Sequence, residues 1–431
     1  MTISELFKTF LEKIQVEKGS IIDDRYKNIT RQLNLYFRNS DSETDNSLRV
    51  GSYGRFTGIK GISDLDMLYI MREDDWKKYN NDQRKILDDT KEALVKYYSS
   101  TDVKVDRLVV DMFFSDGTSF EVQPVFEKNE GGKIVYLYPD TYNGGKWKKT
   151  MPKQEQEAMC DGNKKNNGNL RNLCKILRSW KNYKGVAMGG LLIDTLAYNY
   201  LTSTDKYKDK SFCDYAEMSY DFFNYLHNEE NKPYYLALGS NQQVKVKHSF
   251  SKAAKSAYEK CKEAMEEDDE DKRQKCWREL YGRDFPAVKN IQERFSASTG
   301  FRNTEEFIED RYPLDIRYSL KICCEVKQAG FRNMQLVDFL SSGYYLKPGA
   351  SLDFFVDFSD LKNPYQIVWK VRNCGKIAEE KDDIRGQLIF TTDKNHHENT
   401  RFEGPHYVEC YLIKNKVVVA RDHIDVPIKN M

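Results

Sequence analysis

A Gly-Ser pair followed by two aspartates one residue apart constrains the fold of this chain more than any other feature. The segment reads GSYGRFTGIKGISDLDM from Gly51 to Met67, and an apolar run continues to Met71. Such a run predicts a buried strand, and residues i and i+2 of a strand share one face. We therefore expect Asp64 and Asp66 to point into the same cleft of an α/β protein.

Two carboxylates on one face repel each other and raise at least one pKa unless cations compensate them. Mg²⁺ suits this role, because it prefers oxygen ligands and is usually shared between protein carboxylates and substrate phosphates. Gly51 lets the backbone approach a phosphate closely, and Ser52 adds a hydroxyl donor. An Asp-x-Asp pair alone also occurs at solvated strand ends, so the Gly-Ser turn is what favours a phosphate site with two Mg²⁺ ions, or Mn²⁺ in their place.

A third carboxylate ligand is expected on a neighbouring strand. Val103–Phe114 predicts one strand and Ser119–Phe126 a second, and the turn between them makes a hairpin. Alternation along the second strand turns Glu121 away from the core and toward the expected metal cleft. Asp111 and Asp106 compete for this role, and all three acids are also compatible with solvated strand positions. Glu121 is the predicted third ligand.

These segments resemble a known family. GSYGRFT, SDLDMLYIM and FEVQPVF are similar to the three catalytic motifs of the cGAS/DncV-like nucleotidyltransferases (CD-NTases), bacterial enzymes that make cyclic oligonucleotide signals in CBASS antiphage defence. NLRNLCKILRSWKNY, which ends at Tyr183, resembles the helix that starts the second lobe of this family. CWRELYGRDFP (Cys276–Pro286) resembles its closing signature. The resemblance covers roughly residues 1–300.

The resemblance implies an α/β (α+β) fold in three parts. A polymerase-β-like nucleotidyltransferase core with N-terminal helices is expected over residues 1–160, and a helical lobe that closes the nucleotide cleft over residues 161–298. Asp64, Asp66 and Glu121 are the implied catalytic residues and metal ligands. The Gly51–Ser52 turn is expected to hold the donor triphosphate.

Two basic residues of the helix before Tyr183 are further candidates. Leu and Trp residues at helical spacing make this helix amphipathic and leave Lys175 and Arg178 on other faces. The resemblance implies that both point toward the phosphates of the donor nucleotide. The alternative is that they are ordinary solvated cations of a helix surface.

The sequence pattern changes after the small residues Ser296–Gly300, which predict a linker. From Tyr312 onward, alternating segments separated by Gly, Asn and Asp turns predict a small β-sandwich domain of about seven strands over residues 310–431. The blocks WKVRNCG, IRG and FEGPHYVECYLI resemble the adenylyl/guanylyl and SMODS-type sensor domain that follows such synthases.

A ligand pocket of this sensor domain is also expected. Arginine pairs with phosphates in a bidentate manner and tryptophan stacks on bases. The alternative is that the same residues only close the end of the sandwich. The candidate pocket residues are Trp369, Arg372, Arg385, Arg401 and His406.

Composition narrows the classes of substrate. Lys and Arg number 68 against 67 Asp and Glu, for a formal net charge of +1. Enzymes that grip long nucleic acids usually carry an excess of basic residues, so free nucleoside triphosphates are the expected substrates and nucleic acid is not required. Long apolar runs and a signal peptide are absent, which predicts a cytoplasmic protein with no membrane segment. The nine cysteines match no zinc spacing and are expected to be reduced.

One function and two alternatives follow. The expected function is metal-dependent condensation of nucleoside triphosphates into a cyclic di- or trinucleotide, with release of pyrophosphate, and a downstream effector binds the product rather than this chain. Cyclisation is implied by the resemblance alone. The alternatives are nucleotidyl transfer to RNA, a protein or a small molecule, and a catalytically silent nucleotide sensor. The intact Gly-Ser and acidic motifs argue against a silent protein.

Overall fold

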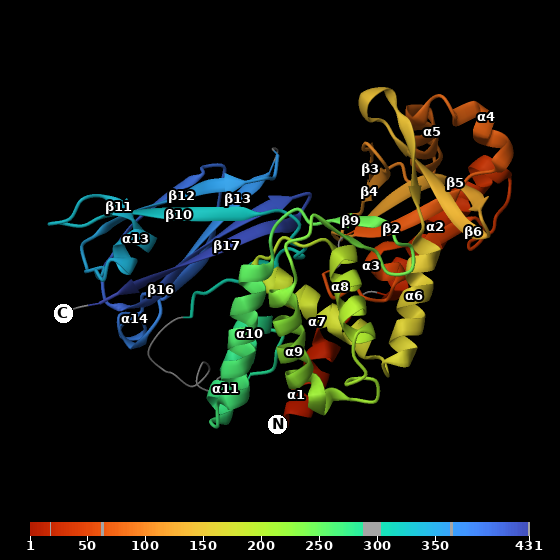
Figure 1. The fold of residues 1–431 in the computed structure, drawn as a ribbon. Helices are drawn as coiled ribbons and strands as arrows, with labels where there is room; N and C mark the ends of the chain where they lie inside the picture. Colours follow the sequence, from red (N-terminus) through yellow and green to blue (C-terminus); the bar gives the residue numbers. More distant parts are fainter. Residues whose placement is uncertain (18, 62–63, 288–302, 363–364, 430–431) are drawn as a thin grey trace. The chain divides into compact units, whose positions relative to one another are not determined.

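The computed structural model describes residues 1–17, 19–61, 64–287, 303–362 and 365–429, and the side chain of Asp64 also lies outside the described residues. The chain divides into two compact units (Figure 1). The first comprises Met1–Ser179 and Gly189–Ser251, and the second comprises Trp180–Met188 and Lys252–Met431. These units do not coincide with the three predicted ranges, because residues 161–298 are divided between them.

A seven-stranded sheet lies at the centre of the first unit, with the order β1-β2-β5-β4-β3 and with β6 and β7 continuing from β5. Strands β2 and β5 are parallel, and every other neighbouring pair is antiparallel. The strands are β1 (Ser47–Arg49), β2 (Asp64–Ile70), β3 (Asp102–Val105), β4 (Val110–Phe113), β5 (Ser119–Glu130), β6 (Lys133–Asp140) and β7 (Lys146–Thr150).

The predicted hairpin is present, but its first strand is shorter than expected. The prediction of one strand over Val103–Phe114 is wrong, because the chain turns between β3 and β4, where the Asp106 amide donates to the Val109 carbonyl at 3.0 Å. Strands β3 and β4 therefore pair with each other. The turn before β5 lies where it was predicted, and Gly117 adopts a positive φ of 88° there.

Two helices cover one face of this sheet. Helix α2 (Gly19–Arg38) contributes Ile29 and Leu33 to a buried cluster, and helix α5 (Gln83–Val95) contributes Ile86. They pack against Met67 of β2 and Val122 of β5. Because side chains alternate along a strand, the acidic residues of β2 and β5 lie on the opposite face, which also carries a second, smaller buried apolar cluster.

The remaining helices of the first unit confirm the expected helical lobe and the two N-terminal helices. The sequence pattern from Trp76 to Ser99 predicts one helix, but the structure has two, since Asp82 caps a new helix start by accepting from the Lys85 amide at 3.0 Å. The further elements are α1 (Ile3–Lys13), α3 (Gly51–Gly54), η1 (Glu73–Asp75), α4 (Trp76–Tyr79), η2 (Tyr142–Gly144), α6 (Pro152–Lys165), α7 (Asn169–Lys184), α8 (Gly190–Thr202), η3 (Phe212–Asp214), α9 (Tyr215–Asn228), β8 (Tyr234–Leu236) and β9 (Gln243–Lys245).

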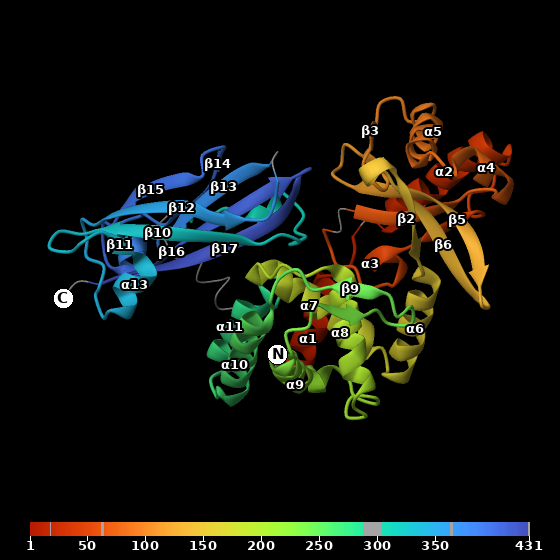
Figure 2. The ribbon, with the colours of Figure 1, turned by 45° about the horizontal axis from the view of Figure 1, so that its top comes forward.

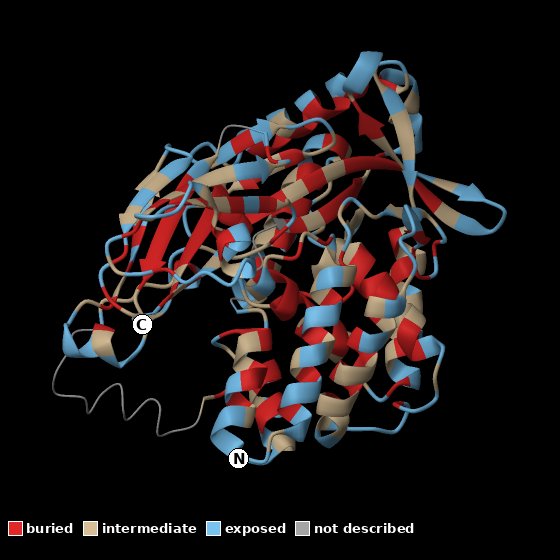
Figure 3. Cartoon of the chain, turned by 60° about the vertical axis from the view of Figure 1, so that its left-hand side comes forward, coloured by how far each residue is buried: buried red, intermediate tan, exposed pale blue. Residues whose placement is uncertain are grey.

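The second unit contains a β-sandwich, as predicted. Two four-stranded antiparallel sheets have the orders β11-β10-β12-β15 and β14-β13-β16-β17 (Figure 2). Residues of both sheets form one buried apolar cluster, and buried residues are drawn in red in Figure 3. The strands are β10 (Leu320–Lys327), β11 (Met334–Gln335), β12 (Ser351–Ser359), β13 (Gln366–Arg372), β14 (Arg385–Thr391), β15 (Asn395–Asn399), β16 (Gly404–Lys414) and β17 (Val417–Ile428).

Helices complete the second unit. They are α10 (Ser251–Glu266), α11 (Glu270–Tyr281), η4 (Ile308–Asp310), α13 (Leu336–Ser341) and α14 (Lys376–Glu380). In both units, every helix of the described residues is too short or too polar to cross a bilayer. All nine cysteines are free, which agrees with the expected reduced thiols.

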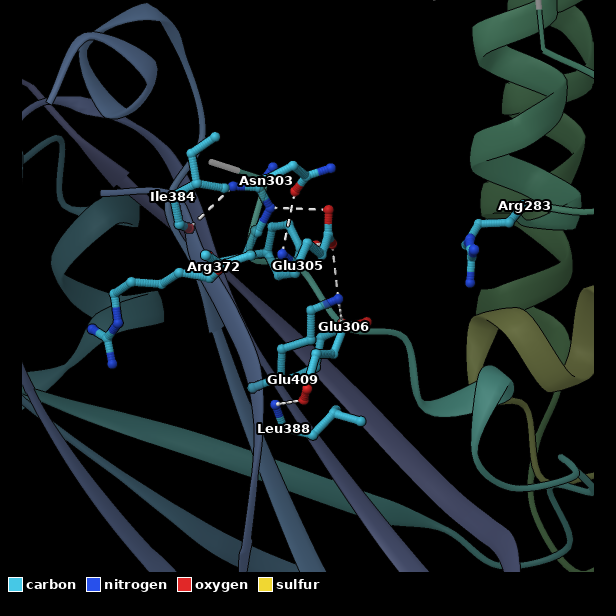
Figure 4. Close-up of polar contacts among 12 residues, drawn as sticks. Arg283, Asn303, Glu305, Glu306, Arg372, Ile384, Leu388 and Glu409 are labelled. Carbon is cyan, nitrogen blue, oxygen red and sulfur yellow. Dashed lines mark hydrogen bonds and ion pairs between the residues drawn. The ribbon is translucent and has the colours of Figure 1, made fainter. Parts of the chain in front are cut away.

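A short segment before η4 lies along the outer face of sheet β14-β13-β16-β17 (Figure 4). The Thr304 hydroxyl donates to the Arg385 carbonyl at 2.8 Å. The Glu306 amide donates to the Gly386 carbonyl at 3.0 Å, and its carboxylate accepts from the Leu388 amide at 2.9 Å. These bonds run along the first residues of β14, so the segment is part of the sandwich. The predicted linker over Ser296–Gly300 lies outside the described residues.

The last turns of α7 are also held within the second unit. Lys181 Nζ donates to Asp315 Oδ1 at 2.6 Å and to the Ile316 carbonyl at 2.7 Å. The Asn182 side chain donates to the Leu314 carbonyl at 2.7 Å. Lys181 is 2% exposed and Asp315 is half-buried, so the carboxylate offsets the cost of burying the lysine ammonium.

Candidate active site

Three acidic residues lie side by side across adjacent strands of the first unit. Asp66 of β2 is the register partner of Glu121 on β5, and Glu121 is the register partner of Asp111 on β4. Register partners share one face of a sheet, and all three residues are half-buried. We call Asp66, Glu121 and Asp111 the acidic row. Asp111, which competed with Glu121 in the sequence, therefore lies beside it.

Two other predicted or competing acids lie outside the acidic row. Asp64 begins β2, and its backbone is in register with Ser119, but its side chain lies outside the described residues. Asp106 is exposed in the turn between β3 and β4. Among the side chains that the structure describes, no group of three His, Cys, Asp or Glu residues is arranged to hold a metal ion. The ligand set of Asp64, Asp66 and Glu121 stays a prediction.

The Gly51–Ser52 turn lies directly against the acidic row. Gly51 has a φ of 65°, and a Cβ atom on it would lie 1.8 Å from Oδ2 of Asp66. No other residue fits this position without displacing the carboxylate. The Val50 amide donates to the Asp66 carbonyl at 2.9 Å, which fixes the turn to β2. The structure therefore brings the predicted phosphate-binding turn and one predicted metal ligand together.

Ser52 is half-buried, and its backbone anchors the loop that follows. Its carbonyl accepts from the Thr57 amide at 2.9 Å and from the Gly58 amide at 3.2 Å. Gln156 of α6 donates to the Arg49 carbonyl at 2.6 Å, on the other side of the turn. The turn is thus held from both ends by hydrogen bonds.

A buried ionic network joins this loop to the helical lobe within the first unit. Arg55 Nε donates to Asp194 Oδ2 at 2.8 Å, and Arg178 Nη1 donates to Asp194 Oδ1 at 2.6 Å. Arg55 also pairs with Glu155 of α6 at 3.3 Å. Burial alone would raise the pKa of Asp194, but the guanidinium groups of Arg178 and Arg55 outweigh it and lower the pKa to about 2.

Arg178 therefore differs from its expected role. Its guanidinium is buried against Asp194 and also donates to the Gly190 carbonyl at 3.0 Å. The physical reason is that Asp194 stands in an apolar stretch of α8, where an ionised carboxylate needs a buried cationic partner. The assignment of Arg178 to the phosphates is corrected to a structural one.

Lys175 is in a different situation. Burial lowers the pKa of its ammonium, and the nearby charge of Arg171 lowers it further. No carboxylate of the described residues forms an ion pair with Lys175. Arg171, one turn earlier on α7, donates to the Arg55 carbonyl at 3.2 Å. Lys175 therefore remains the better candidate for an anionic ligand.

Sequence reasoning missed Arg55, Arg171 and Asp194. One signal was present: GLLIDTL places a single acid inside an apolar helical run, which predicts a buried ion partner. A second signal was the arginine within GSYGRFT itself. Neither signal identifies which residues pair.

In the second unit, three of the five predicted pocket residues line one cavity. Arg385, Arg401 and His406 lie around it. Trp369 does not, since it is 0% exposed in the core between the sheets, so it cannot stack on a base. Arg372 does not line the cavity either, because alternation along β13 turns Val371 inward and Arg372 to the outer face. There Arg372 pairs with Glu305 at 3.1 Å and donates to the Ile384 carbonyl at 3.0 Å (Figure 4).

Comparisons with known proteins place these features in a family. Residues 1–163 match the Second Messenger Oligonucleotide or Dinucleotide Synthetase (SMODS) domain. Residues 302–429 match the Adenylyl/Guanylyl and SMODS C-terminal sensor domain. The two matches agree with the predicted catalytic core and the predicted sensor domain.

Two curated relatives are similar in sequence. A probable cyclic nucleotide synthase of Bacillus cereus is 24% identical over 188 residues, which are 39% of this chain and 52% of that protein. This chain thus spans about half the length of the Bacillus relative. A cyclic AMP-AMP-AMP synthase of Acinetobacter sp. is 24% identical over 325 residues, which are 69% of this chain and 89% of that protein.

Solved structures share the fold. The Escherichia coli CdnC in complex with HORMA-deltaN has a TM-score of 0.51 at 14% identity, covering 66% of this chain and 98% of that chain. CdnC with ATP has a TM-score of 0.50 at 15% identity and the same coverage. These likenesses confirm the expected fold of the nucleotidyltransferase part. With a SMODS domain and a SMODS-associated sensor domain in one chain, this protein belongs to the CD-NTases, the cGAS/DncV-like nucleotidyltransferases.

Proposed function

We propose that this chain is a metal-dependent nucleotidyltransferase that condenses nucleoside triphosphates into a cyclic di- or trinucleotide, releases pyrophosphate and acts in bacterial antiphage signalling. The observation that carries the proposal is the acidic row directly beside the Gly51–Ser52 turn. The SMODS match supports it, as do the two relatives, one a probable cyclic nucleotide synthase and the other a cyclic AMP-AMP-AMP synthase.

The acidic row supplies two of the three predicted metal ligands, Asp66 and Glu121, and the donor type suits divalent cations. Asp66 and Glu121 are register partners, so their carboxylates offer hard oxygen ligands at one level of the sheet, and Asp64 precedes them on β2. The backbone of Gly51 approaches the Asp66 carboxylate closely enough to leave no room for a side chain. Asp64, Asp66 and Glu121 would hold two Mg²⁺ ions, or Mn²⁺, whose charge would activate an attacking hydroxyl and neutralise the leaving pyrophosphate.

The chain supplies the remaining contacts to the donor nucleotide. The Gly51 backbone and the Ser52 hydroxyl hold the triphosphate, because amide and hydroxyl donors complement phosphate oxygens. Lys175 adds positive charge from α7. The Arg55–Asp194–Arg178 network orients the loop and the helices that carry these groups. A second transfer on the linear product closes the ring, and a downstream effector binds the cyclic product.

The test incubates the purified full chain with Mg²⁺ or Mn²⁺ and labelled nucleoside triphosphates, singly and in mixtures, followed by phosphatase treatment and chromatography. We expect a phosphatase-resistant product from the wild type and none from Asp66→Asn. Asp106→Asn is the matched control, since Asp106 is an exposed acid outside the acidic row, and it should retain the product.

Other outcomes identify the alternatives. Label attached to added RNA, to protein or to a small molecule identifies a different acceptor and overturns cyclisation. No incorporation from any triphosphate with either metal, while the nucleotides still bind, favours a silent sensor. An equal product from Asp66→Asn and the wild type overturns the role of the acidic row.

A further inference from the structure

A cavity opens between the two sheets of the sandwich in the second unit. Its space, including the part that is open to solvent, is about 430 Å³. Buried apolar side chains of β12, β13, β16 and β17 form its floor, so the floor belongs to the same core that holds the sheets together. The floor residues are Leu352, Phe354, Val371, Val408, Val426 and Ile428.

The rim of the cavity is charged. Arg385 of β14 pairs with Glu398 of β15, with Nη1 donating to Oε2 at 2.6 Å and Nη2 donating to Oε1 at 2.7 Å. This bidentate pair joins the two sheets. Burial alone would raise the pKa of Glu398, but bonds from Arg385 and His396 outweigh it and lower the pKa to about 2. Arg401 also lines the cavity, and its guanidinium lies 3.7 Å from Asp383 Oδ2.

Hydrogen bonds hold the rim in place. Arg385 has a φ of 59°, an unfavourable conformation for a residue with a Cβ, which the surrounding structure maintains. Thr400 Oγ1 donates to the Lys347 carbonyl at 2.6 Å and accepts from the Ala350 amide at 2.8 Å. His406 Nδ1 accepts from the Cys374 amide at 3.1 Å. The fold therefore fixes the positions of the rim residues.

We propose that this cavity binds a small planar aromatic or heteroaromatic compound with one anionic group. The ring lies on the apolar floor, because burial of apolar surface favours it there. The anion lies against Arg385, since guanidinium groups form the strongest hydrogen bonds with anionic oxygens. Glu398 competes with the ligand for Arg385. The site is independent of the nucleotidyl transfer proposed above, because every residue that forms it lies in the sandwich.

The test titrates 8-anilino-1-naphthalenesulfonate, an aromatic anion whose fluorescence rises in apolar sites, into the full chain. We expect Arg385→Gln to weaken binding about tenfold, which is the loss of one charge-assisted hydrogen bond. Glu398→Gln should tighten binding about threefold, because it removes the competing carboxylate. Val371→Trp should abolish binding by filling the cavity. Arg332→Gln, an exposed arginine between β10 and β11, is the control and should change nothing.

Two competitors identify the source of the anion. Displacement of the probe by adenosine 5′-monophosphate assigns the site to nucleotides, and displacement by salicylate assigns it to aromatic acids. Failure of both to compete overturns the ligand class. Circular dichroism checks that Val371→Trp folds. If Val371→Trp does not fold, the proposal is tested by the opposite changes in probe affinity expected for Arg385→Gln and Glu398→Gln. Unchanged probe binding in both variants overturns the proposal.

Discussion

The catalytic sheet and the outer face of the sandwich each carry ionisable residues across three adjacent strands, in opposite arrangements. In the first unit, acid lies beside acid in the acidic row. In the second unit, an acid lies between two bases. This mixed row consists of Lys370 on β13, Glu409 on β16 and His423 on β17. Like charges directly opposite each other destabilise a sheet, whereas opposite charges stabilise it.

The mixed row shows how a sheet holds charge for structural reasons. Lys370 Nζ lies 3.5 Å from Glu409 Oε2, and Arg421 Nη2 donates to Glu409 Oε1. Lys370 and Glu409 are both buried. Burial alone would raise the pKa of Glu409, but Arg421 outweighs it and holds the pKa well below its usual range. Each charge has a partner in the fold, so this row contributes to stability rather than to chemistry.

The acidic row gives the opposite lesson. Three adjacent carboxylates repel one another, and divalent cations relieve that repulsion. Acids on adjacent strands of one face are the ligands that divalent cations prefer, and the position of the acidic row beside the Gly51–Ser52 turn supports the proposed function. The following predictions test whether the two rows differ in this way, beginning with the largest effect.

Asp66→Asn should reduce nucleotide incorporation by about 10³-fold, because it removes a charge that stabilises the transition state through the metal. Its melting temperature should be unchanged or higher, since the substitution relieves repulsion in the acidic row. Incorporation assays and thermal denaturation measure the two effects. A fully active variant, or one that fails to fold, contradicts the distinction between the rows.

Glu409→Gln should lower stability and not nucleotide incorporation, the reverse of Asp66→Asn. It leaves Arg421 buried without its carboxylate partner, which should lower the free energy of unfolding by about 3 kcal/mol. Urea denaturation measures this loss. Glu380→Gln, in an exposed pair with Lys376, is the control and should cost less than about 1 kcal/mol. Equal effects of the two substitutions would mean that the mixed row is not a structural device.

Asp194→Asn should affect both stability and catalysis. Removing the shared carboxylate of Arg55 and Arg178 should cost about 3 kcal/mol of stability. Because Arg55 belongs to the loop after the Gly51–Ser52 turn, KM for the triphosphate should also rise. Denaturation measures the loss of stability, and steady-state kinetics at a temperature where the variant is fully folded measure the rise in KM. A stability loss with unchanged kinetics would limit the network to a structural role.

Lys175→Met should raise KM about tenfold, a loss of roughly 1.4 kcal/mol of phosphate interaction. The substitution keeps the length of the side chain and removes its charge. Lys164→Met, an exposed lysine of α6, is the control and should leave KM unchanged. Identical kinetics for both variants would contradict a phosphate contact for Lys175.

His423 should give the mixed row a small pH dependence. Burial alone would lower its pKa, but Asp425 and Glu409 outweigh it and raise the pKa to about 9. The contribution of protonated His423 to the free energy of unfolding is therefore complete below pH 6.5 and is lost as the pH rises through about 9. Because 41% of the side chain is exposed, solvent screening limits the effect to about 1 kcal/mol. Urea midpoints between pH 6 and 10 should lose this slope in His423→Gln.

The sequence alone determined the faces of the strands around the site and the position of the turn before β5. Alternation correctly placed Glu121 opposite the core of β5, and it predicted the sandwich from Tyr312 onward. The Gly-Ser turn was equally readable, because only glycine fits beside Asp66. These features depend on local backbone geometry, which neighbouring residues fix. Breaks inside elements were harder to predict, since one N-cap such as Asp82 starts a new helix within a pattern that predicts a single helix.

Only the tertiary structure decided which charged residues are partners. Arg55 and Asp194 are 139 positions apart, and no local pattern joins them. The same holds for Arg178, which seemed free for a phosphate but is buried, and for Arg372, which lies on the other face of its sheet from the cavity. The face on which a strand residue lies follows from the alternation of side chains along the backbone. Ion pairs depend instead on packing between segments that are distant in the sequence, and packing is a property of the whole fold.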